Sequence, residues 1–176
     1  AFFSPRLSTE RERIAGLVKD REVVINMFGG VGMFSLLAAK DTACTVYNID
    51  LNPVATQLCK ENAQINKLKG EVISLNGDAT KVIDEQLSGK ADRVLMLLPE
   101  RSDEFLDSAL NGLKNKGIIH YYSHMHADKK QDAPKLSEEH FMSVNKTNAE
   151  IITSRNVRPV GPRFYQTVVD VKISKN

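Results

Sequence analysis

The sequence of 176 residues lacks the features of a membrane or secreted protein. No apolar run is long enough to cross a bilayer, and no segment has the pattern of a signal peptide. Cysteine is scarce, since Cys44 and Cys59 are the only two and they do not form a C-x-x-C pair. We therefore expect no disulfide framework and a reduced, cytoplasmic setting.

The chain also lacks a strong excess of charge, with a formal net charge of +2. Such a balance neither requires nor excludes a nucleic-acid partner, because a local basic patch matters more than the total. The apolar and charged fractions are those of an ordinary globular protein, and the length fits one domain over residues 1–176. An initiating Met is missing, so we expect this domain to be part of a longer chain.

An apolar run that ends in a glycine-rich turn organises the first half of the sequence. Residues 23–32 read Val-Val-Ile-Asn-Met-Phe-Gly-Gly-Val-Gly and lead into a second apolar segment at 33–39, which predicts strand, tight turn and helix. Glycine lets a backbone approach a ligand closely, and the helix that follows offers free N–H groups. The spacing only approximates a dinucleotide fingerprint. The turn is a candidate nucleotide-cofactor loop, with an ordinary turn as the alternative.

Acidic residues follow the next two β-rich runs. Asp50 ends the run 45–49, about 20 residues after the loop, where a carboxylate can accept both hydroxyls of a ribose. Asp78 follows the run 72–75. Each could instead cap a loop, but two acids at successive strand ends beside a glycine turn favour a cofactor site.

Strands and helices alternate along most of the chain. After the first strand we expect strands at 45–49, 72–75, 93–97 and 117–122, helices at 33–39, 53–66, 80–87, 102–113 and 134–147, and a final hairpin of strands at 149–157 and 165–173. This order predicts an α/β fold with a mostly parallel seven-stranded sheet that ends in an antiparallel hairpin. It resembles the class I, Rossmann-like methyltransferases, and this favours S-adenosylmethionine over NAD as the cofactor.

The first thirteen residues, Ala-Phe-Phe-Ser-Pro-Arg-Leu-Ser-Thr-Glu-Arg-Glu-Arg, run from an aromatic pair into a helix. We expect the helix to start at Ser8 or Thr9, which puts Glu10 in its first turn. In one interpretation Glu10 favours the helix dipole and the arginines around it form a solvated face. In the other, Glu10 is a carboxylate base ringed by those arginines. They are Arg6, Arg11 and Arg13.

Together these motifs resemble the archaeal and eukaryotic tRNA (guanine-N1)-methyltransferases that act at position 37, beside the anticodon. The string from Phe3 to Arg11 is the most specific part of the resemblance, which runs through the whole chain. The other matching motifs are Asn26-Met-Phe-Gly-Gly-Val-Gly32, Asp50-Leu-Asn-Pro53, Asn62 with Asn66-Lys-Leu68, Gly77-Asp78, Leu98-Pro99 and Pro162-x-x-Tyr165. The same superfamily includes an aminocarboxypropyl transferase of the wybutosine pathway, which also uses S-adenosylmethionine.

The resemblance implies a class I methyltransferase domain over residues 1–176 that lacks the tRNA-recognition domains which precede it in the family. Such an enzyme would transfer the methyl group of S-adenosylmethionine to N1 of guanosine 37, presented by the tRNA anticodon loop as a flipped base. We expect the protein to be a monomer that binds no metal ion and does not associate with a membrane. In this interpretation Glu10 removes the N1 proton, and Arg6 and Arg11 neutralise charge on guanine O6 or hold adjacent phosphates.

The resemblance also assigns binding residues. The cofactor positions are Phe2, Phe3, Arg6, Asn26, Phe28, Gly29, Gly30, Gly32, Asp50, Leu51, Asn52, Asp78, Ala79 and Leu97. The tRNA positions are Leu98, Pro99, Arg158 and Arg163. Among the cofactor positions, the glycines would pass the methionine moiety, Asp50 would hold the ribose hydroxyls, and Asp78 would accept from the adenine amine.

Three positions depart from the family pattern. Phe2 replaces a tyrosine, Asn26 replaces an aspartate, and Leu97 replaces the asparagine of an Asn-Leu-Pro motif. An asparagine there can hydrogen-bond the target base, and Leu97 cannot. Aminocarboxypropyl transfer, or a domain that binds the cofactor without turnover, therefore stays open as an alternative, and an NAD-dependent dehydrogenase is a distant one.

Four histidines raise the question of a metal. His124-x-His126 has a spacing seen in metal sites, and His120 and His140 lie near it in the sequence. We expect His124 and His126 in a loop after the fifth strand, with no cysteine nearby and no carboxylate at a typical ligand spacing. The pattern therefore predicts no metal site.

Overall fold

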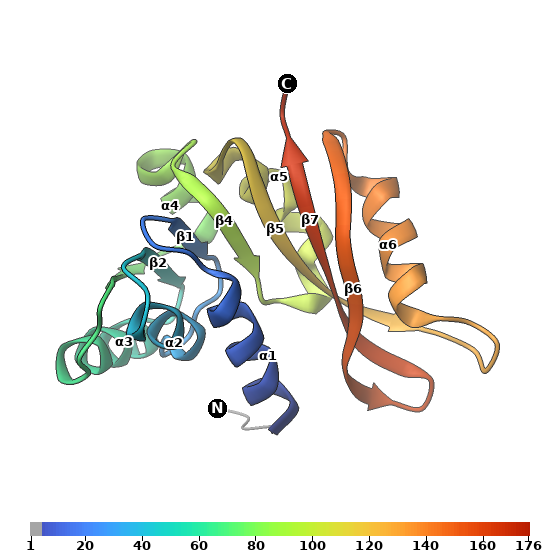
Figure 1. The fold of residues 1–176 in the computed structure, drawn as a ribbon, viewed down its shortest axis with the longest axis horizontal. Coiled ribbons are helices and arrows are strands. Elements are labelled where there is room, and N and C mark those ends of the chain that lie inside the picture. The colour runs from blue at the N-terminus through green and yellow to red at the C-terminus, as the bar shows by residue number, and fades with distance from the viewer. Residues whose placement is uncertain (1–4) are drawn as a thin grey trace.

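Seven strands form one sheet in the order β3-β2-β1-β4-β5-β7-β6 (Figure 1). The computed structural model describes residues 5–176, and side chains from residue 7 onward. The strands are β1 (Val23–Asn26), β2 (Thr45–Asp50), β3 (Glu71–Asn76), β4 (Ala91–Met96), β5 (Leu113–His126), β6 (Asn148–Gly161) and β7 (Phe164–Ser174). Strands β1 to β5 pair in parallel, whereas β7 is antiparallel to both β5 and β6. The predicted fold class is confirmed.

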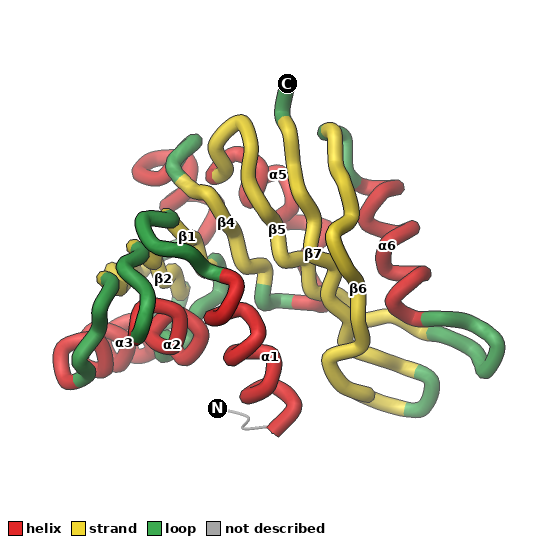
Figure 2. Tube along the Cα trace, in the orientation of Figure 1, coloured by secondary structure: helices red, strands yellow, loops and turns green. Residues whose placement is uncertain are grey.

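Helices cover both faces of this sheet (Figure 2). They are α1 (Pro5–Leu17), α2 (Met33–Lys40), α3 (Pro53–Ile65), α4 (Ala79–Val82), the π-helical turn η1 (Ile83–Leu87), the 3₁₀ turn η2 (Pro99–Arg101), α5 (Ser102–Gly112) and α6 (Ala133–Val144). Successive strand residues point to opposite faces, so Ile25 packs against α4, η1 and α5 while Val24 packs against α1 and α2. Both faces are buried, which explains the nearly continuous apolar runs of the central strands.

Short polar residues fix where the helices of the parallel half begin. The Asn52 side chain accepts a hydrogen bond from Val54 N at 2.9 Å, and Pro53 occupies the first helical position of α3. Asp78 caps α4 by accepting from Lys81 N at 3.0 Å. These caps satisfy backbone donors that have no partner inside the helix. They also hold the residues after β2 and β3 at the carboxyl edge of the sheet.

Several expectations about boundaries are wrong. The strand predicted at 149–157 continues to Gly161, and the helix predicted at 134–147 ends at Val144. Helix α1 already includes Pro5, because proline lacks the N–H that a first turn leaves unused, so Glu10 lies in the second turn and not the first. The expected helix at 80–87 is divided into α4 and the π-helical turn η1. His124 and His126 lie within β5, which is longer than expected because it pairs with β7 as far as His126 and Phe164.

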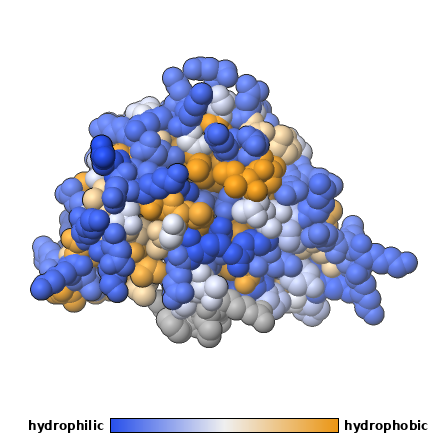
Figure 3. Space-filling model, viewed as in Figure 1, coloured by the Kyte–Doolittle hydropathy of each residue, from blue (hydrophilic) through white to orange (hydrophobic). Residues whose placement is uncertain are grey.

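The face that carries α1 has an apolar area near its centre, bordered by hydrophilic residues (Figure 3). Leu17, at the end of α1, is 40% exposed. In the described part of the chain, no helix is both long enough and apolar enough to cross a membrane.

Candidate functional site

The glycine turn after β1 has a backbone that only glycine adopts easily. Gly30 and Gly32 have φ angles of +55° and +94°. A Cβ at Gly29 would lie 1.9 Å from Asn48 Oδ1, so a side chain there would collide with β2. The Asn62 side chain of α3 donates to Val31 O at 3.3 Å. The sequence thus specifies a tight turn at the sheet edge, in which Gly29 and Gly30 are half-buried.

Asp50 ties this turn to the start of α3. Its Oδ2 accepts from Gly30 N at 2.9 Å, and its Oδ1 accepts from Asn52 N at 2.9 Å. The half-buried carboxylate therefore does cap loops, which is the alternative to cofactor binding that the sequence allows. Each carboxylate oxygen can accept more than one hydrogen bond, so Asp50 keeps acceptor capacity for ligand hydroxyls. Gly77 N donates to Asp50 O at 3.0 Å, which brings the turn that holds Asp78 beside it.

Buried amides support the turn from below. Asn26 Nδ2 donates to Ser35 Oγ at 3.1 Å, Ser35 Oγ donates to Asn48 Oδ1 at 2.7 Å, and Asn48 Nδ2 donates to Gly30 O at 3.2 Å. Asn26 Oδ1 is buried and has no hydrogen-bond partner among the described residues. A buried acceptor left open beside a glycine turn fits a site that a polar ligand completes.

A cleft of about 450 Å³ opens between the glycine turn, α1, the end of β4 and the terminal hairpin. Its lining comprises Leu7, Arg11, Phe28, Gly29, Gly30, Val31, Met33, Phe34, Leu97, Leu98, Pro99, Glu100, Tyr122, His124, Arg158 and Gln166. Half of these are residues that the sequence predicts at the catalytic, cofactor or tRNA positions: Arg11, Phe28, Gly29, Gly30, Leu97, Leu98, Pro99 and Arg158. Asp50 ends β2, and residues 51–52 and 78–79 follow β2 and β3 at the same sheet edge, outside this cleft.

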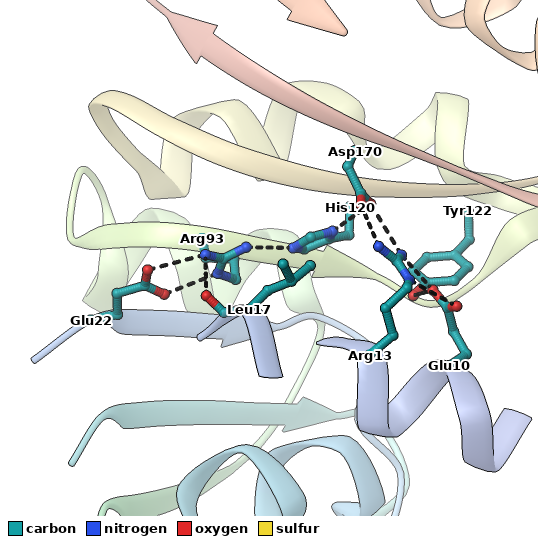
Figure 4. Close-up of polar contacts among 8 residues, drawn as sticks. All are labelled: Glu10, Arg13, Leu17, Glu22, Arg93, His120, Tyr122 and Asp170. Carbon is teal, nitrogen blue, oxygen red and sulfur yellow. Dashed lines mark hydrogen bonds and ion pairs between the residues drawn. The ribbon is translucent and has the colours of Figure 1, made fainter. Parts of the chain in front are cut away.

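Glu10 lies beneath the cleft and is only 1% exposed. Its Oε1 accepts from Tyr122 Oη at 2.7 Å and from Arg13 Nη2 at 2.7 Å, and its Oε2 accepts from Arg13 Nε at 3.1 Å (Figure 4). The interpretation in which Glu10 favours the helix dipole from the first turn is wrong, because α1 has no acidic residue there. Arg13 pairs with the buried Glu10 and is not part of a solvated face. Arg11 does reach the cleft, where its guanidinium lies 5.7 Å from the Phe34 ring centroid.

The network continues from Arg13 across the sheet. Arg13 Nη1 contacts Asp170 Oδ2 at 2.5 Å, and Asp170 Oδ1 lies 2.7 Å from His120 Nδ1. His120 Nε2 lies 2.8 Å from Arg93 Nη1, and Arg93 in turn pairs with Glu22 at 2.9 Å. Figure 4 shows that α1, β4, β5 and β7 all contribute to this chain of contacts. A buried set of charges is tolerable because each one has an opposite partner.

The protonation states follow from these contacts. Arg93 can only donate, so His120 Nε2 accepts and the ring proton on Nδ1 is donated to Asp170. Burial lowers the pKa of His120, which agrees with a neutral ring. Burial alone would raise the pKa of Asp170, but hydrogen bonds from His120 and Arg13 outweigh it and hold the pKa at about 2.

The terminal hairpin separates the two arginines that were expected to contact tRNA. Arg158 lines the cleft and donates from Nε to Gln166 Oε1 at 2.9 Å. Arg163 lies at the tip of the hairpin with a φ of +53°, and its exposed side chain is 3.6 Å from the exposed Asp128 carboxylate. Only Arg158 therefore lies with the candidate site.

Some predicted site residues lie outside the part of the chain that the structure describes, and some residues of the site were not predicted. Phe2, Phe3 and the side chain of Arg6 are outside the described residues. Sequence reasoning missed Tyr122 and Gln166, because only the folded sheet brings β5 and β7 against α1. Within residues 5–176 no three His, Cys, Asp or Glu side chains are grouped to hold a metal.

A second hollow, of about 580 Å³, lies on the other side of α1, against α2 and the end of α3. Asn62, Asn66 and Leu68 of the matching motifs contribute to its lining. It does not contain the glycine turn, so we do not assign it to the candidate site.

The glycine turn, the acid at the end of β2 and the antiparallel last strand define a class I methyltransferase fold. The family model described as the TRM5/TYW2 methyltransferase domain matches residues 1–152. The chain belongs to this family, and the suspected resemblance is confirmed.

Two curated relatives illustrate the similarity. The chain is 39% identical to tRNA (guanine(37)-N(1))-methyltransferase Trm5b of Methanocaldococcus jannaschii, over 99% of this chain and 47% of that protein. It is 40% identical to tRNA 4-demethylwyosine(37)-methyltransferase Taw21 of Saccharolobus solfataricus, over 97% of this chain and 62% of that protein. The chain thus spans about half to three fifths of the length of these relatives.

Solved structures agree with this family. The complex of aTrm5 with tRNALeu superposes with a TM-score of 0.81 at 34% identity, over 99% of this chain and 48% of that one. M. jannaschii TYW2 in complex with AdoMet superposes with a TM-score of 0.80 at 28% identity, over 100% of this chain and 79% of that one.

Proposed function

We propose that this chain is the catalytic domain of a tRNA methyltransferase that transfers the methyl group of S-adenosylmethionine to N1 of guanosine 37. The observation that carries the proposal is the cleft itself. Its lining includes both the glycine turn and Tyr122, whose hydroxyl donates to the buried Glu10. The name of the Trm5b relative and the tRNA complex of aTrm5 support the choice of substrate. The proposed partner is the anticodon loop, with the target base flipped out.

The cofactor fits the groups at the sheet edge. Asp50 would accept from the ribose hydroxyls, Asp78 from the adenine amine, and the backbone of the glycine turn would pass the methionine part. When bound, S-adenosylmethionine supplies a methyl group that its sulfonium already activates. The further cofactor contacts that we propose are Phe2, Phe3, Arg6, Asn26, Phe28, Leu51, Asn52, Ala79 and Leu97.

The chemistry requires a base, because guanine N1 carries a proton that must leave as N1 attacks the methyl carbon. We assign this role to Glu10, the carboxylate beneath the cleft. Arg11, which lines the cleft, and Arg6 would neutralise charge on guanine O6 or hold a neighbouring phosphate. Leu98 and Pro99 would contact the base, and Arg158 and Arg163 the tRNA backbone. Holding both reactants in line supplies much of the remaining acceleration.

The proposed setting and assembly follow from the same domain. Both cysteines are buried and free, which supports a reducing, cytoplasmic location. We propose a monomeric catalytic unit that needs no metal, since proton removal and methyl transfer are each provided for by groups named above.

A second candidate concerns the acceptor base. Leu97 is half-buried in the cleft lining and offers no amide for guanine, and the Taw21 relative is as similar to this chain as the Trm5b relative is. Methyl transfer to 4-demethylwyosine at position 37 is therefore the second candidate. Aminocarboxypropyl transfer differs from both in the cofactor carbon that is attacked.

One experiment separates these activities. The full-length parent protein is incubated with S-adenosylmethionine labelled either in the methyl group or in the aminocarboxypropyl group, and with tRNA that carries guanosine or 4-demethylwyosine at position 37. Methyl label on guanine N1 is the expected result. Methyl label only on 4-demethylwyosine would favour the second candidate, aminocarboxypropyl label would favour the other transfer, and no label would overturn all three.

A further inference from the structure

The proposed base and the cleft do not meet directly. Glu10 is 1% exposed and is absent from the cleft lining, whereas Leu7 and Arg11, its neighbours on α1, are part of that lining. A substrate in the cleft would therefore need another group to carry its proton to Glu10.

Tyr122 is the residue that lies between them. Its side chain is 1% exposed, as that of Glu10 is, but unlike Glu10 it contributes to the cleft lining. Its Oη donates to Glu10 Oε1 at 2.7 Å (Figure 4). The ring packs against Val168 of β7 and against Leu7 and Leu97, which fixes its orientation. Arg13, which also donates to Glu10, is not part of the cleft lining.

We propose that Tyr122 is a further catalytic residue, which relays the proton of guanine N1 to Glu10. This inference rests on the proposed function. The N1 proton passes to Tyr122 Oη while the proton of Tyr122 passes to Glu10 Oε1, so the phenol is neutral before and after the step. The electron pair left on N1 forms the bond to the methyl carbon, and the pair of the broken carbon–sulfur bond stays on sulfur.

The charges around Tyr122 require the two transfers to be concerted. The charged groups that face its hydroxyl are Glu10 and Arg13 from α1 and Asp170 from β7. Burial and then the Glu10 carboxylate raise the pKa of Tyr122 well above its usual value. A free phenolate is therefore disfavoured, and Tyr122 can accept a proton only as it gives its own to Glu10.

The test compares Tyr122→Phe with Tyr121→Phe in the full-length protein. Tyr121 is the neighbouring residue of β5, is 0% exposed and also donates its hydroxyl to a carboxylate, Asp103. Its ring packs on the other face of the sheet against Phe141, outside the cleft. The two variants thus lose the same group from the same strand, and only one loses it beside Glu10.

The single-turnover rate of methyl transfer to tRNA with guanosine 37 is measured over a range of pH at saturating cofactor. At neutral pH we expect Tyr122→Phe to lower the rate by about 100-fold and to leave cofactor affinity unchanged, with Tyr121→Phe within about threefold of wild type. The defect should shrink as the pH rises toward the pKa of guanine N1, because the substrate then loses its proton without a relay. A structural defect would not depend on pH in this way.

A Tyr122→Phe rate equal to wild type, or a pH-independent loss shared with Tyr121→Phe, overturns the relay while leaving the proposed function intact. Wild-type protein that places no methyl group on guanosine 37 overturns the proposed function, and the relay with it. If Tyr122→Phe fails to fold, the wild-type rate is measured in mixtures of H₂O and D₂O. A curved dependence on the deuterium fraction is expected for two protons in motion, and a linear or absent dependence overturns the relay.

Discussion

The two sides of the candidate site bury polar groups in different ways. Beside the glycine turn, neutral amides and a hydroxyl bond to one another, as Ser35 and Asn48 do, and the hydrogen bonds end on the backbone: Asp50 accepts from Gly30 N, and Asn48 donates to Gly30 O. Beneath α1, charged side chains pair with one another, as Glu10 and Arg13 do. The first arrangement shapes a loop and leaves acceptors for a ligand. The second neutralises buried charges and fixes one carboxylate in place.

This difference predicts that changes on the two sides have separable effects. A substitution at the turn should weaken cofactor binding, because the ligand completes that side. A substitution beneath α1 should impair the chemical step or the stability of the fold, because that side is complete without a ligand.

The largest effect is expected for Glu10→Gln. The amide keeps the size of the side chain but removes the base, so methyl transfer should slow by about 1,000-fold. Cofactor affinity, measured by calorimetry, should stay within about threefold of wild type, since Glu10 lies outside the turn. Glu12→Gln is the matched control, because Glu12 is exposed on the same helix. Undiminished transfer by Glu10→Gln would show that Glu10 is not the base.

Asp50→Ala tests the other side. It removes the acceptors proposed for the ribose and two loop hydrogen bonds, so cofactor affinity should fall by more than about 100-fold. Asp50→Asn keeps one acceptor oxygen and should lose less. Calorimetric titration with S-adenosylmethionine measures the affinity of both variants. An unchanged affinity of Asp50→Ala would show that the turn side of the site is not where the cofactor binds.

Whether a contact on either side of the site could be predicted from the sequence depends on how far apart its two residues lie along the chain. Gly30 and Asp50 are 20 residues apart, and each belongs to a local pattern of strand and turn, so the turn and its acid could be predicted. Tyr122 and Asp170 are 112 and 157 residues from their α1 partners. No local pattern links them, and only the strand order, with β7 inserted beside β5, brings them together.

Boundaries were also harder to predict where a distant partner decides them. The end of β4 and the cap of α3 depend on neighbours in sequence and were placed within a residue or two. The length of β5 depends on pairing with β7, a segment some fifty residues later, and was underestimated. The same pairing moved His124 and His126 from an expected loop into a strand.

Asp170→Asn tests whether the buried charges beneath α1 stabilise the fold. The variant leaves Arg13 and His120 without their shared anion, so the free energy of unfolding at pH 7 should fall by about 2 to 3 kcal/mol. Because folding lowers the pKa of Asp170 from 3.8 to about 2, its contribution is present above about pH 4 and is lost as the pH falls toward 2.

Urea unfolding at pH 7 and at decreasing pH measures this effect. The difference between wild type and Asp170→Asn should therefore shrink between about pH 4 and pH 2. Asp128→Asn is the control, because Asp128 pairs with Arg163 at the exposed surface and should change stability by less than about 0.5 kcal/mol. A difference that does not depend on pH would show that the Asp170 charge is not what stabilises the network.

The smallest effect is expected for the two arginines of the terminal hairpin. Like the two sides of the site, they lie in different surroundings. Arg158 lies in the cleft lining, oriented by Gln166, whereas Arg163 lies at the exposed tip and pairs with Asp128. Arg158→Ala should lower tRNA affinity by about 5-fold and reduce its salt dependence by about one contact, and Arg163→Ala should do less than half of that. Filter binding at several salt concentrations measures both. Equal losses would mean that the tRNA follows the hairpin to its tip, so the substrate surface would extend well beyond the cleft.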